Sequence, residues 1–388
     1  MLHLPIYMDY NATTPCDPRV VETMMPLFSR HFGNAASRNH SFGWQAEELV
    51  DIARKQVADL IGAEASEIIF TSGATEADNL AIKGVLEAYS SKGTHIITVK
   101  TEHKAVLDTC THIEKKGANI TLLGVNSDGI IDLAELQAAI RPETILIAVM
   151  YANNETGVIQ PIAEIGEIAK RHKLLFFSDA TQAAGKVPVN VISDGIDLLA
   201  MSAHKMYGPK GVGALYVRRR NPRVKVISQQ DGGGHERGIR SGTLNVPGIA
   251  GFGKACEIAA LEMSDDNHRL ANLRNRLERG LIKSGGSGVN GSTQYRLPHV
   301  TNISFEHADG EAMIAGLNKS VAVSSGSACM SASMEPSYVL KAMGVSDEMA
   351  FRSLRFSIGK YTTEEEIDYT IAEVDRVMKK LKETFNLI

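Results

Sequence analysis

One stretch indicates both a central strand of the fold and a reactive side chain: Asp197-Leu-Leu-Ala-Met-Ser202-Ala-His204-Lys205-Met-Tyr-Gly208-Pro-Lys-Gly211. Its apolar run predicts a short buried strand, after which a hydroxyl, an imidazole and an amine precede a loop of glycine and proline. A lysine at the end of a buried strand loses hydration, which lowers the pKa of its amine and favours the neutral form that condenses with a carbonyl group. The same residue types also suit a polar cap between a strand and a loop. This stretch alone leaves both interpretations open.

A second apolar run ends in a carboxylate. Leu174-Leu-Phe-Phe-Ser178 predicts another buried strand, and Asp179 and Gln182 follow it. Neighbouring strands of a parallel sheet present their carboxyl ends to a common crevice. We therefore expect Asp179 and Gln182 to lie near Lys205.

The composition is that of a globular protein of 388 residues. A chain of this length can bury a large core, and its size suggests about two or three domains. The formal net charge of −4 gives no reason to expect a nucleic-acid partner. The sequence has no apolar run of about 18 residues, and its first residues lack the basic and apolar regions of a secretory signal. We therefore expect a cytoplasmic protein that does not span a membrane.

The four cysteines, Cys16, Cys110, Cys256 and Cys329, are widely spaced and include no C-x-x-C pair. In a chain of this size the spacing argues against a disulfide framework and against a zinc site. The histidines form no H-E-x-x-H motif, so the sequence gives no support for metal-dependent hydrolysis. The first three cysteines are expected to be ordinary buried or half-buried residues.

Predicted strands and helices alternate along the first 217 residues, with short connections between them. This alternation is typical of a mainly parallel sheet that helices cover on both faces. Functional side chains then gather where the strands end. The polar residues at those ends are Thr75, His103, Asn154, Asp179, Gln182, Ser202, His204 and Lys205.

One of the expected helices runs from near Ser41 to Gly62, where a glycine ends it. Apolar residues recur along it at helical spacing. We expect these residues to face the core, and they are Trp44, Leu49, Ile52, Val57 and Leu60.

The turn Thr71-Ser72-Gly73-Ala74-Thr75-Glu76 lies between a predicted strand and a predicted helix. A hydroxyl-rich turn at this position directs free backbone N–H groups and the helix dipole at an anion, so it suits a phosphate. The same residues suit a plain helix cap formed by Ser72 or Thr75. By itself the turn favours the cap, and both interpretations remain open.

The last third of the chain predicts a second, smaller unit. The run 231–243 is too rich in glycine and polar residues for a regular element, so we expect a loop there. A long helix is expected from about Pro247 into the 270s, and we place the boundary of a smaller domain within it. The run Ser284-Gly-Gly-Ser-Gly288 predicts a flexible break.

Cys329 follows Ser325-Gly-Ser-Ala, a run of small residues that predicts a mobile loop. A thiol on such a loop suits a nucleophile that visits one site and delivers to another. After the loop, a helix is expected to begin at Glu335-Pro336, with proline in its favoured first turn. A strand from Ser353 to Ile358 then carries Arg355.

Taken together, five motifs in order and at matching intervals resemble the pyridoxal-phosphate-dependent cysteine desulfurases, the NifS/IscS-like group of the class V aminotransferase-like fold. The resemblance covers nearly the whole chain. The motifs are Thr71-Ser-Gly-Ala-Thr75-Glu76, Asp179-Ala-Thr-Gln182, Ser202-Ala-His204-Lys205, Arg240-Ser-Gly-Thr243 and Ser325-Gly-Ser-Ala-Cys329.

The resemblance implies an α/β protein of the fold-type I pyridoxal-phosphate transferases. A large cofactor-binding domain with a mainly parallel sheet is expected over residues 16–262. A smaller α+β domain, formed by residues 1–15 and 263–388, is expected to carry the mobile cysteine loop.

The resemblance also implies a reaction, in which L-cysteine becomes L-alanine and its sulfur remains on Cys329 as a persulfide. Lys205 would bind pyridoxal 5'-phosphate covalently and then serve as base and acid at the substrate Cα. Asp179 would pair with the pyridinium nitrogen, and Gln182 would hydrogen-bond the phenolic oxygen of the ring. His103 would stack on the ring and shuttle the thiol proton.

The remaining site residues are likewise implied by the resemblance. Arg355 would bind the substrate carboxylate as a two-pronged fork. Asn154 would contact both substrate and cofactor. Thr243 matches a position that reaches the phosphate of a neighbouring subunit, which implies a homodimer. Backbone N–H groups and hydroxyls would hold the phosphate at Ala74, Thr75, Ser202 and His204.

Cys329 resembles the mobile cysteine that hands sulfur to separate acceptor proteins, such as an iron–sulfur scaffold with which it transiently shares a cluster as a metal ligand. Two departures put the usual scaffold docking in doubt. Met330 stands where the close family has a small hydroxyl residue, and the chain ends at Ile388, short of the extension that scaffold-binding members use.

Two alternative functions remain open. A related lyase acting on selenocysteine or cysteine sulfinate would not need Cys329 to the same degree. A non-catalytic assembly protein of the same fold would bind partners through the basic run Arg218–Arg223, although the presence of Lys205, Asp179 and Cys329 argues against it.

Overall fold

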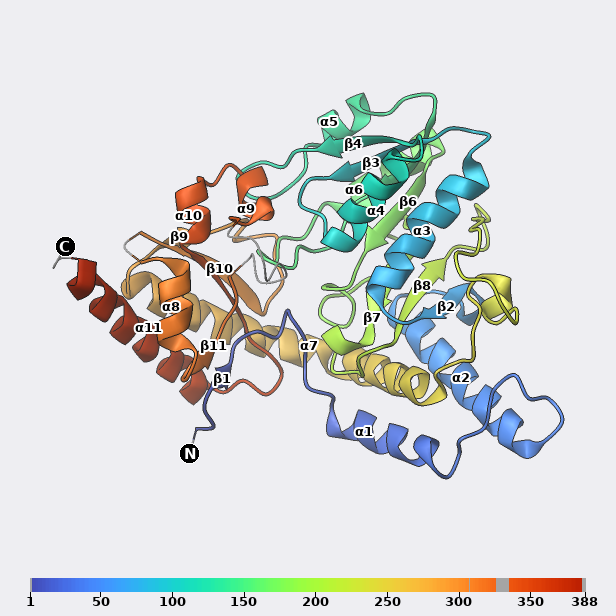
Figure 1. The fold of residues 1–388 in the computed structure, drawn as a ribbon, viewed down its shortest axis with the longest axis horizontal. Helices are drawn as coiled ribbons and strands as arrows, with labels where there is room; N and C mark the ends of the chain where they lie inside the picture. Colours follow the sequence, from blue (N-terminus) through green and yellow to red (C-terminus); the bar gives the residue numbers. More distant parts are fainter. Residues whose placement is uncertain (1, 307, 326–334, 386–388) are drawn as a thin grey trace.

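A seven-stranded sheet forms the centre of the computed structural model, which describes residues 2–306, 308–325 and 335–385 (Figure 1). Five neighbouring strands are parallel, and only β8 runs against both of its neighbours. Because β2 is antiparallel to β8, β2 points the same way as the five. The predicted mainly parallel sheet is therefore confirmed. In order across the sheet, the strands are β2 (Ile68–Thr71), β8 (Gly213–Val217), β7 (Leu198–Ser202), β6 (Leu175–Asp179), β5 (Thr144–Ala148), β3 (His95–Val99) and β4 (Asn119–Leu123).

Helices cover both faces of this sheet, because its strands bury apolar side chains on each side. Phe176 packs into one core and its neighbour Phe177 into the other, as the alternation of a strand requires. One face is covered by α3 (Ala74–Tyr89) and α4 (Lys104–Glu114). The opposite face packs against α2 (Ser41–Leu60), α5 (Leu133–Ala138), α6 (Ile162–His172) and the first part of α7 (Val246–Lys283), while α1 (Pro18–Met24) lies on α7.

The predicted inward face of α2 is partly wrong. Trp44 and Ile52 are 56% and 50% exposed, whereas Val57 is buried as expected. The helix instead turns its small residues to α7, and a Cβ atom on Gly253 would lie only 2.5 Å from Cα of Ala53. This close approach of two backbones leaves the large apolar side chains on the outside.

A smaller unit, orange and red in Figure 1, contains two further sheets. Strand β10 (Val300–Phe305) pairs antiparallel with β9 (Gly286–Val289) and β12 (Ser353–Ser357), and β1 (Ile6–Tyr7) pairs with β11 (Val321–Ala322). The first strand of the chain thus belongs to the unit formed mainly by its last third. The helices of this unit are α8 (Gly310–Leu317), α9 (Tyr338–Ala342), α10 (Asp347–Phe351) and α11 (Glu364–Phe385).

Two local predictions in this unit are wrong. The run Ser284–Gly288 is not simply a break, because Gly286 begins β9, which finds a partner in β10. The helix expected at Glu335-Pro336 begins at Tyr338, because Ser337 caps it and accepts a hydrogen bond from the backbone N of Leu340 at 3.2 Å.

Helix α7 connects the two units, as Figure 1 shows. Its first buried residues, Val246 to Ile258, pack in the core of the large sheet, while Leu270 to Leu281 pack in the core of the smaller unit. The helices within the described part of the chain include none that is long and apolar enough to cross a membrane.

Candidate active site

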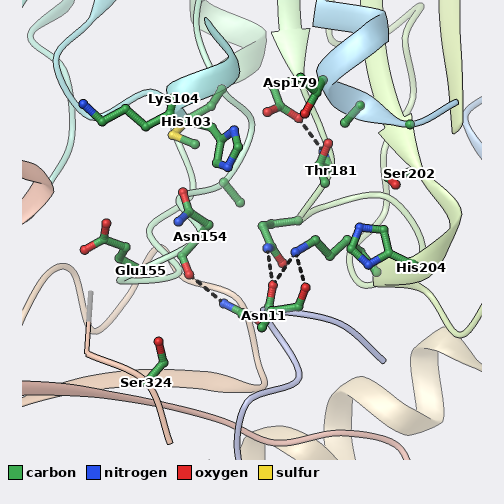
Figure 2. Close-up of a pocket in the computed structure, with 18 of the residues that line it drawn as sticks. Asn11, His103, Lys104, Asn154, Glu155, Asp179, Thr181, Ser202, His204 and Ser324 are labelled. Atoms are coloured by element: carbon green, nitrogen blue, oxygen red, sulfur yellow. Dashed lines mark hydrogen bonds between the residues drawn. The ribbon is translucent and has the colours of Figure 1, made fainter. Parts of the chain in front are cut away.

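A cavity of about 620 Å³ lies at the edge of the large sheet where the parallel strands end. Residues that follow β2, β3, β5, β6 and β7 line it, together with the N-terminal segment and β12 (Figure 2). Shared strand direction brings these distant residues to one edge. The predicted site residues in its wall are Ala74, Thr75, His103, Asn154, Asp179, Gln182, Ser202, His204, Lys205 and Arg355.

Lys205 lies in a short 3₁₀ turn, Ala203–Lys205, directly after β7. Its Nζ donates hydrogen bonds to the backbone oxygens of Asn11 at 2.6 Å and Ala12 at 2.8 Å. The amine is therefore held at the cavity wall by two carbonyl groups of the N-terminal segment.

Asn11 was not predicted as a site residue, yet it joins the two units at the cavity. Its side-chain Nδ2 donates to the backbone oxygen of Asn154 at 3.0 Å, which turns its Oδ1 to Nε2 of His299 at 2.7 Å. Its backbone N donates to Oγ of Ser357 at 2.9 Å. Nothing in the sequence around Asn11 carries a functional signal by itself.

Asp179 ends β6 and Gln182 follows it, and both face the cavity. One oxygen of Asp179 accepts the backbone N–H of Thr181 at 2.9 Å, which fixes the carboxylate. Gln182 donates from Nε2 to the backbone oxygen of Asn11 at 3.0 Å. Its carbonyl end accepts from Nζ of Lys186 at 2.8 Å.

The turn before α3 does not cap the helix in the way that the sequence favoured. Gly73 is the N-cap, and no side chain in the described structure accepts the free N–H groups of the first turn. Capping by Ser72 or Thr75 is therefore wrong. The first N–H groups of this 16-residue helix, at Ala74 and Thr75 in the cavity wall, remain available to an anion.

Ser202 and His204 lie beside this helix end in the cavity wall. Burial, with added repulsion from Lys205 and Lys210, lowers the pKa of His204 to about 4. The ring is therefore neutral near pH 7, and its Nδ1 lies 3.1 Å from Oγ1 of Thr13. A neutral imidazole and a hydroxyl can both donate hydrogen bonds to an anion.

Arg355 on β12 enters the cavity from the smaller unit. Its guanidinium donates to the backbone oxygen of Asn154 at 2.9 Å and to Asp9 at 2.6 Å. Three buried polar atoms at this wall have no hydrogen-bond partner among the residues described: Nε of Arg355, Oδ1 of Asn154 and Oγ1 of Thr181. Such buried atoms need a partner, and a ligand in the cavity can supply it.

His103 is the N-cap of α4, and its Nδ1 accepts the backbone N–H of Ala105 at 3.1 Å. Because Nδ1 is an acceptor, the neutral ring carries its hydrogen on Nε2. A single imidazole nitrogen thus remains to exchange a proton in the cavity.

Two predicted residues are not in the cavity wall as described. Thr243 is exposed and is not among the lining residues. Cys329 lies outside the described residues. Ser324 on one side of its segment and Glu335 on the other both line the cavity, so both flanks of that segment reach the site.

A family model described as aminotransferase class-V matches residues 6–370. The chain belongs to this family. A cysteine desulfurase IscS from Anaeromyxobacter sp. (strain Fw109-5) is 57% identical over 385 residues, 98% of this chain and 94% of the relative. A solved NifS-like protein has a TM-score of 0.88 at 36% identity and covers 99% of this chain and 100% of its own. A structure of SspA in complex with cysteine has a TM-score of 0.82 at 37% identity, covering 92% and 100% respectively. The resemblance inferred from the five motifs is confirmed.

The cavity of this class-V family member fits pyridoxal 5'-phosphate in the chemistry of its donors. An amine, a carboxylate and an amide face it from Lys205, Asp179 and Gln182, and the open start of α3 suits the phosphate. Over residues 2–306, 308–325 and 335–385 there is no cluster of three His, Cys, Asp or Glu side chains able to hold a metal ion.

Proposed function

We infer that this protein is a cysteine desulfurase that converts L-cysteine to L-alanine and transfers the sulfur to a thiol of the enzyme. The predicted enzyme class is confirmed by full-length relatives, of which one named cysteine desulfurase is 57% identical over 98% of this chain. The observation that supports the chemistry is the meeting of Lys205, Asp179 and Arg355 in one cavity, from parts of the chain far apart in sequence.

Pyridoxal 5'-phosphate, when bound, supplies an electron sink for the negative charge that develops at the substrate Cα. Lys205 would hold it covalently and Asp179 would keep its ring nitrogen protonated, while Gln182 donates to its phenolic oxygen. The phosphate would lie at the start of α3, with donors from Ala74, Thr75, Ser202 and His204.

Arg355 would receive the substrate carboxylate, and Asn154, whose Oδ1 has no partner among the described residues, lines the same cavity. The amine of Lys205 would take the Cα proton and return it. His103 would shuttle the thiol proton: its Nε2–H would give a proton to Cβ, and the proton of the substrate thiol, carried over on the persulfide, would replace it. The thiolate of Cys329 attacks the substrate sulfur, so the Cβ–S bond breaks while an S–S bond forms. Cβ keeps the electron pair and gains a proton, which gives alanine and a persulfide.

We propose that the enzyme is a homodimer in which Thr243 reaches the phosphate site of the partner. Thr243 is exposed on a loop and is not among the residues that line its own cavity. Large apolar side chains are exposed between the end of α1 and the first turn of α2, and the rings of Phe32 and Phe42 among them lie 5.5 Å apart. Exposed apolar surface of this kind supports a protein interface. The exposed residues are Met25, Phe28, Phe32, Phe42 and Trp44.

The stored sulfur would pass to acceptor proteins, including an iron–sulfur scaffold with which Cys329 transiently shares a cluster as a metal ligand. We place this exchange in the cytoplasm. Cys16, Cys110 and Cys256 are free thiols, which suits a reducing compartment.

The chain would divide into a large cofactor-binding domain, residues 16–262, and a smaller one formed by residues 1–15 and 263–388. The two separate cores along α7 support a boundary within that helix.

Mass spectrometry after incubation with L-cysteine tests the function. We expect one added sulfur on Cys329 that a reductant removes, and none in the Lys205→Ala variant. A colourless protein that gains no colour with pyridoxal phosphate would instead favour the non-catalytic assembly protein. Equal alanine production by Cys329→Ala from cysteine, selenocysteine and cysteine sulfinate would favour the related lyase.

A further inference from the structure

Lys186 lies behind the cavity, where no motif marked it. It is absent from the lining residues, but its Nζ donates to Oε1 of Gln182 at 2.8 Å. Burial lowers the pKa of Lys186 well below its usual range, and the charges of Lys205 and Arg355 lower it further. Placing a half-buried cation beside two other cations costs free energy, which indicates that Lys186 has a function here.

The first consequence concerns the orientation of the Gln182 amide. Its nitrogen end donates to the backbone oxygen of Asn11, which also accepts from Lys205, and its oxygen end accepts from Lys186. A flipped amide would set oxygen against the Asn11 carbonyl and NH₂ against the Lys186 amine. Both contacts would be repulsive. Lys186 therefore holds the NH₂ end of the Gln182 amide on the side of Lys205.

The second consequence concerns charge. The groups that act on Lys186 are Lys205 in the 3₁₀ turn after β7 and Arg355 on β12, and both are cationic. Burial lowers the pKa of two nearby imidazoles, His204 and His299, and the charge of Lys186 lowers both further. A neighbouring cation disfavours protonation of an amine, which favours the reactive neutral form.

We propose that Lys186 is a positioning residue of the desulfurase, which turns the amide N–H of Gln182 toward the phenolic oxygen of the cofactor and disfavours a positive charge on the nitrogen of Lys205. This inference rests on the proposed function. Lys186 acts through Gln182 and through its charge, without touching the substrate.

The test is a pH titration of the visible absorption band that forms when pyridoxal phosphate is added to the purified protein. Without the cation, and with Gln182 free to flip, protonation of the lysine-bound nitrogen becomes easier. We expect Lys186→Met to raise the pH midpoint by about one unit, a tenfold gain in proton affinity. Lys186→Arg keeps the charge and a donor, so its midpoint should remain near that of the wild type.

Lys115→Met, at an exposed lysine just after α4, is the matched control and should leave the midpoint unchanged. A wild-type midpoint in Lys186→Met would overturn the role of Lys186 while leaving the desulfurase intact. Absence of any band in the wild type would instead refute the proposed function. Lys186→Gln keeps a donor but loses the charge, so it provides the comparison if the methionine variant does not fold.

Discussion

Glu155 lies at the cavity wall, and its carboxyl group binds a proton more tightly in the folded protein than in the unfolded chain. Burial raises the pKa of Glu155 to about 7, although a hydrogen bond from Ser337 and the charge of Arg355 oppose the rise. The unfolded chain releases this proton near its ordinary pKa of 4.5. Stability should therefore decline as pH rises from about 4.5 to about 7 and then level off.

Glu155→Gln removes this decline, because the amide stays neutral at every pH. The free energy of unfolding from urea titrations at several pH values should show a wild-type loss of up to about 3 kcal/mol across this range that the variant lacks. Glu87→Gln, at an exposed position on α3, is the control. Parallel curves for wild type and Glu155→Gln would contradict the prediction.

The guanidinium of Arg355 offers a second prediction about a single residue. Lysine at this position keeps the charge but loses the fork that can hold both oxygens of a carboxylate. We expect Arg355→Lys to raise KM for L-cysteine by about 10- to 100-fold, the loss of one charge-assisted hydrogen bond of about 1.5–3 kcal/mol. Binding of pyridoxal phosphate should change little. An unchanged KM would show that the carboxylate lies elsewhere.

Residues that carry the chemistry themselves could be predicted, and those that position them could not. Lys205 and Asp179 each end an apolar strand, which is a local signal. Asn11 acts through long-range contacts, among them those with Gln182 and Lys205, which lie 171 and 194 positions along the chain. The local sequence around Asn11 or Lys186 does not indicate such a distant partner.

At the level of elements, the glycine-rich run 231–243 is a loop as predicted, except for a short 3₁₀ turn at Glu236–Gly238, and a buried ion pair holds it in place. Arg54 of α2 makes two hydrogen bonds of 2.7 Å to Glu236, which also accepts the backbone N–H of Phe70 at 2.8 Å. Glu236 and Arg237 have left-handed φ angles of 48° and 58°. The ion pair therefore sustains a backbone conformation that these residue types rarely adopt.

Glu236→Gln should destabilise the protein by about 3–5 kcal/mol, since it leaves the buried Arg54 without its charge partner. In the double variant with Arg54→Met the second substitution should cost much less than it does alone, because neither buried charge then remains. Urea unfolding of the two single variants and the double variant measures this coupling. Additive losses would mean that Glu236 acts through the Phe70 backbone rather than through Arg54.

The pattern of apolar residues predicted strands better than helix faces. Strands such as β6 and β7 are buried on both sides, so any apolar run marks them. The buried face of α2 depends on how closely α7 approaches, and the contact between Ala53 and Gly253 involves residues with little hydrophobic signal. Trp44 was therefore assigned to the wrong face.

At the scale of the whole molecule, each phosphate site of the proposed dimer can receive Thr243 from its own chain or from the partner chain. Thr243 is exposed and is not among the residues that line its own cavity, which supports a contact with the partner's site. Thr243→Ala should weaken cofactor retention by about 10-fold or more, through loss of a hydrogen bond to a charged group. Lys205→Ala should abolish persulfide formation altogether.

Mixed dimers of these two variants show whether Thr243 contacts the phosphate site of its own chain or that of the partner chain. If Thr243 acts across it, the chain with Thr243→Ala receives a threonine from its Lys205→Ala partner and regains a complete site. At limiting pyridoxal phosphate, each mixed dimer should then have one complete site of two, so isolated mixed dimers should recover about half of the wild-type persulfide yield. If Thr243 acts within its own chain, no site in the mixed dimer is complete and the yield stays at that of the unmixed variants. Mixing Lys205→Ala with Asp179→Ala is the control, since both residues line one cavity and neither partner can supply the other's loss.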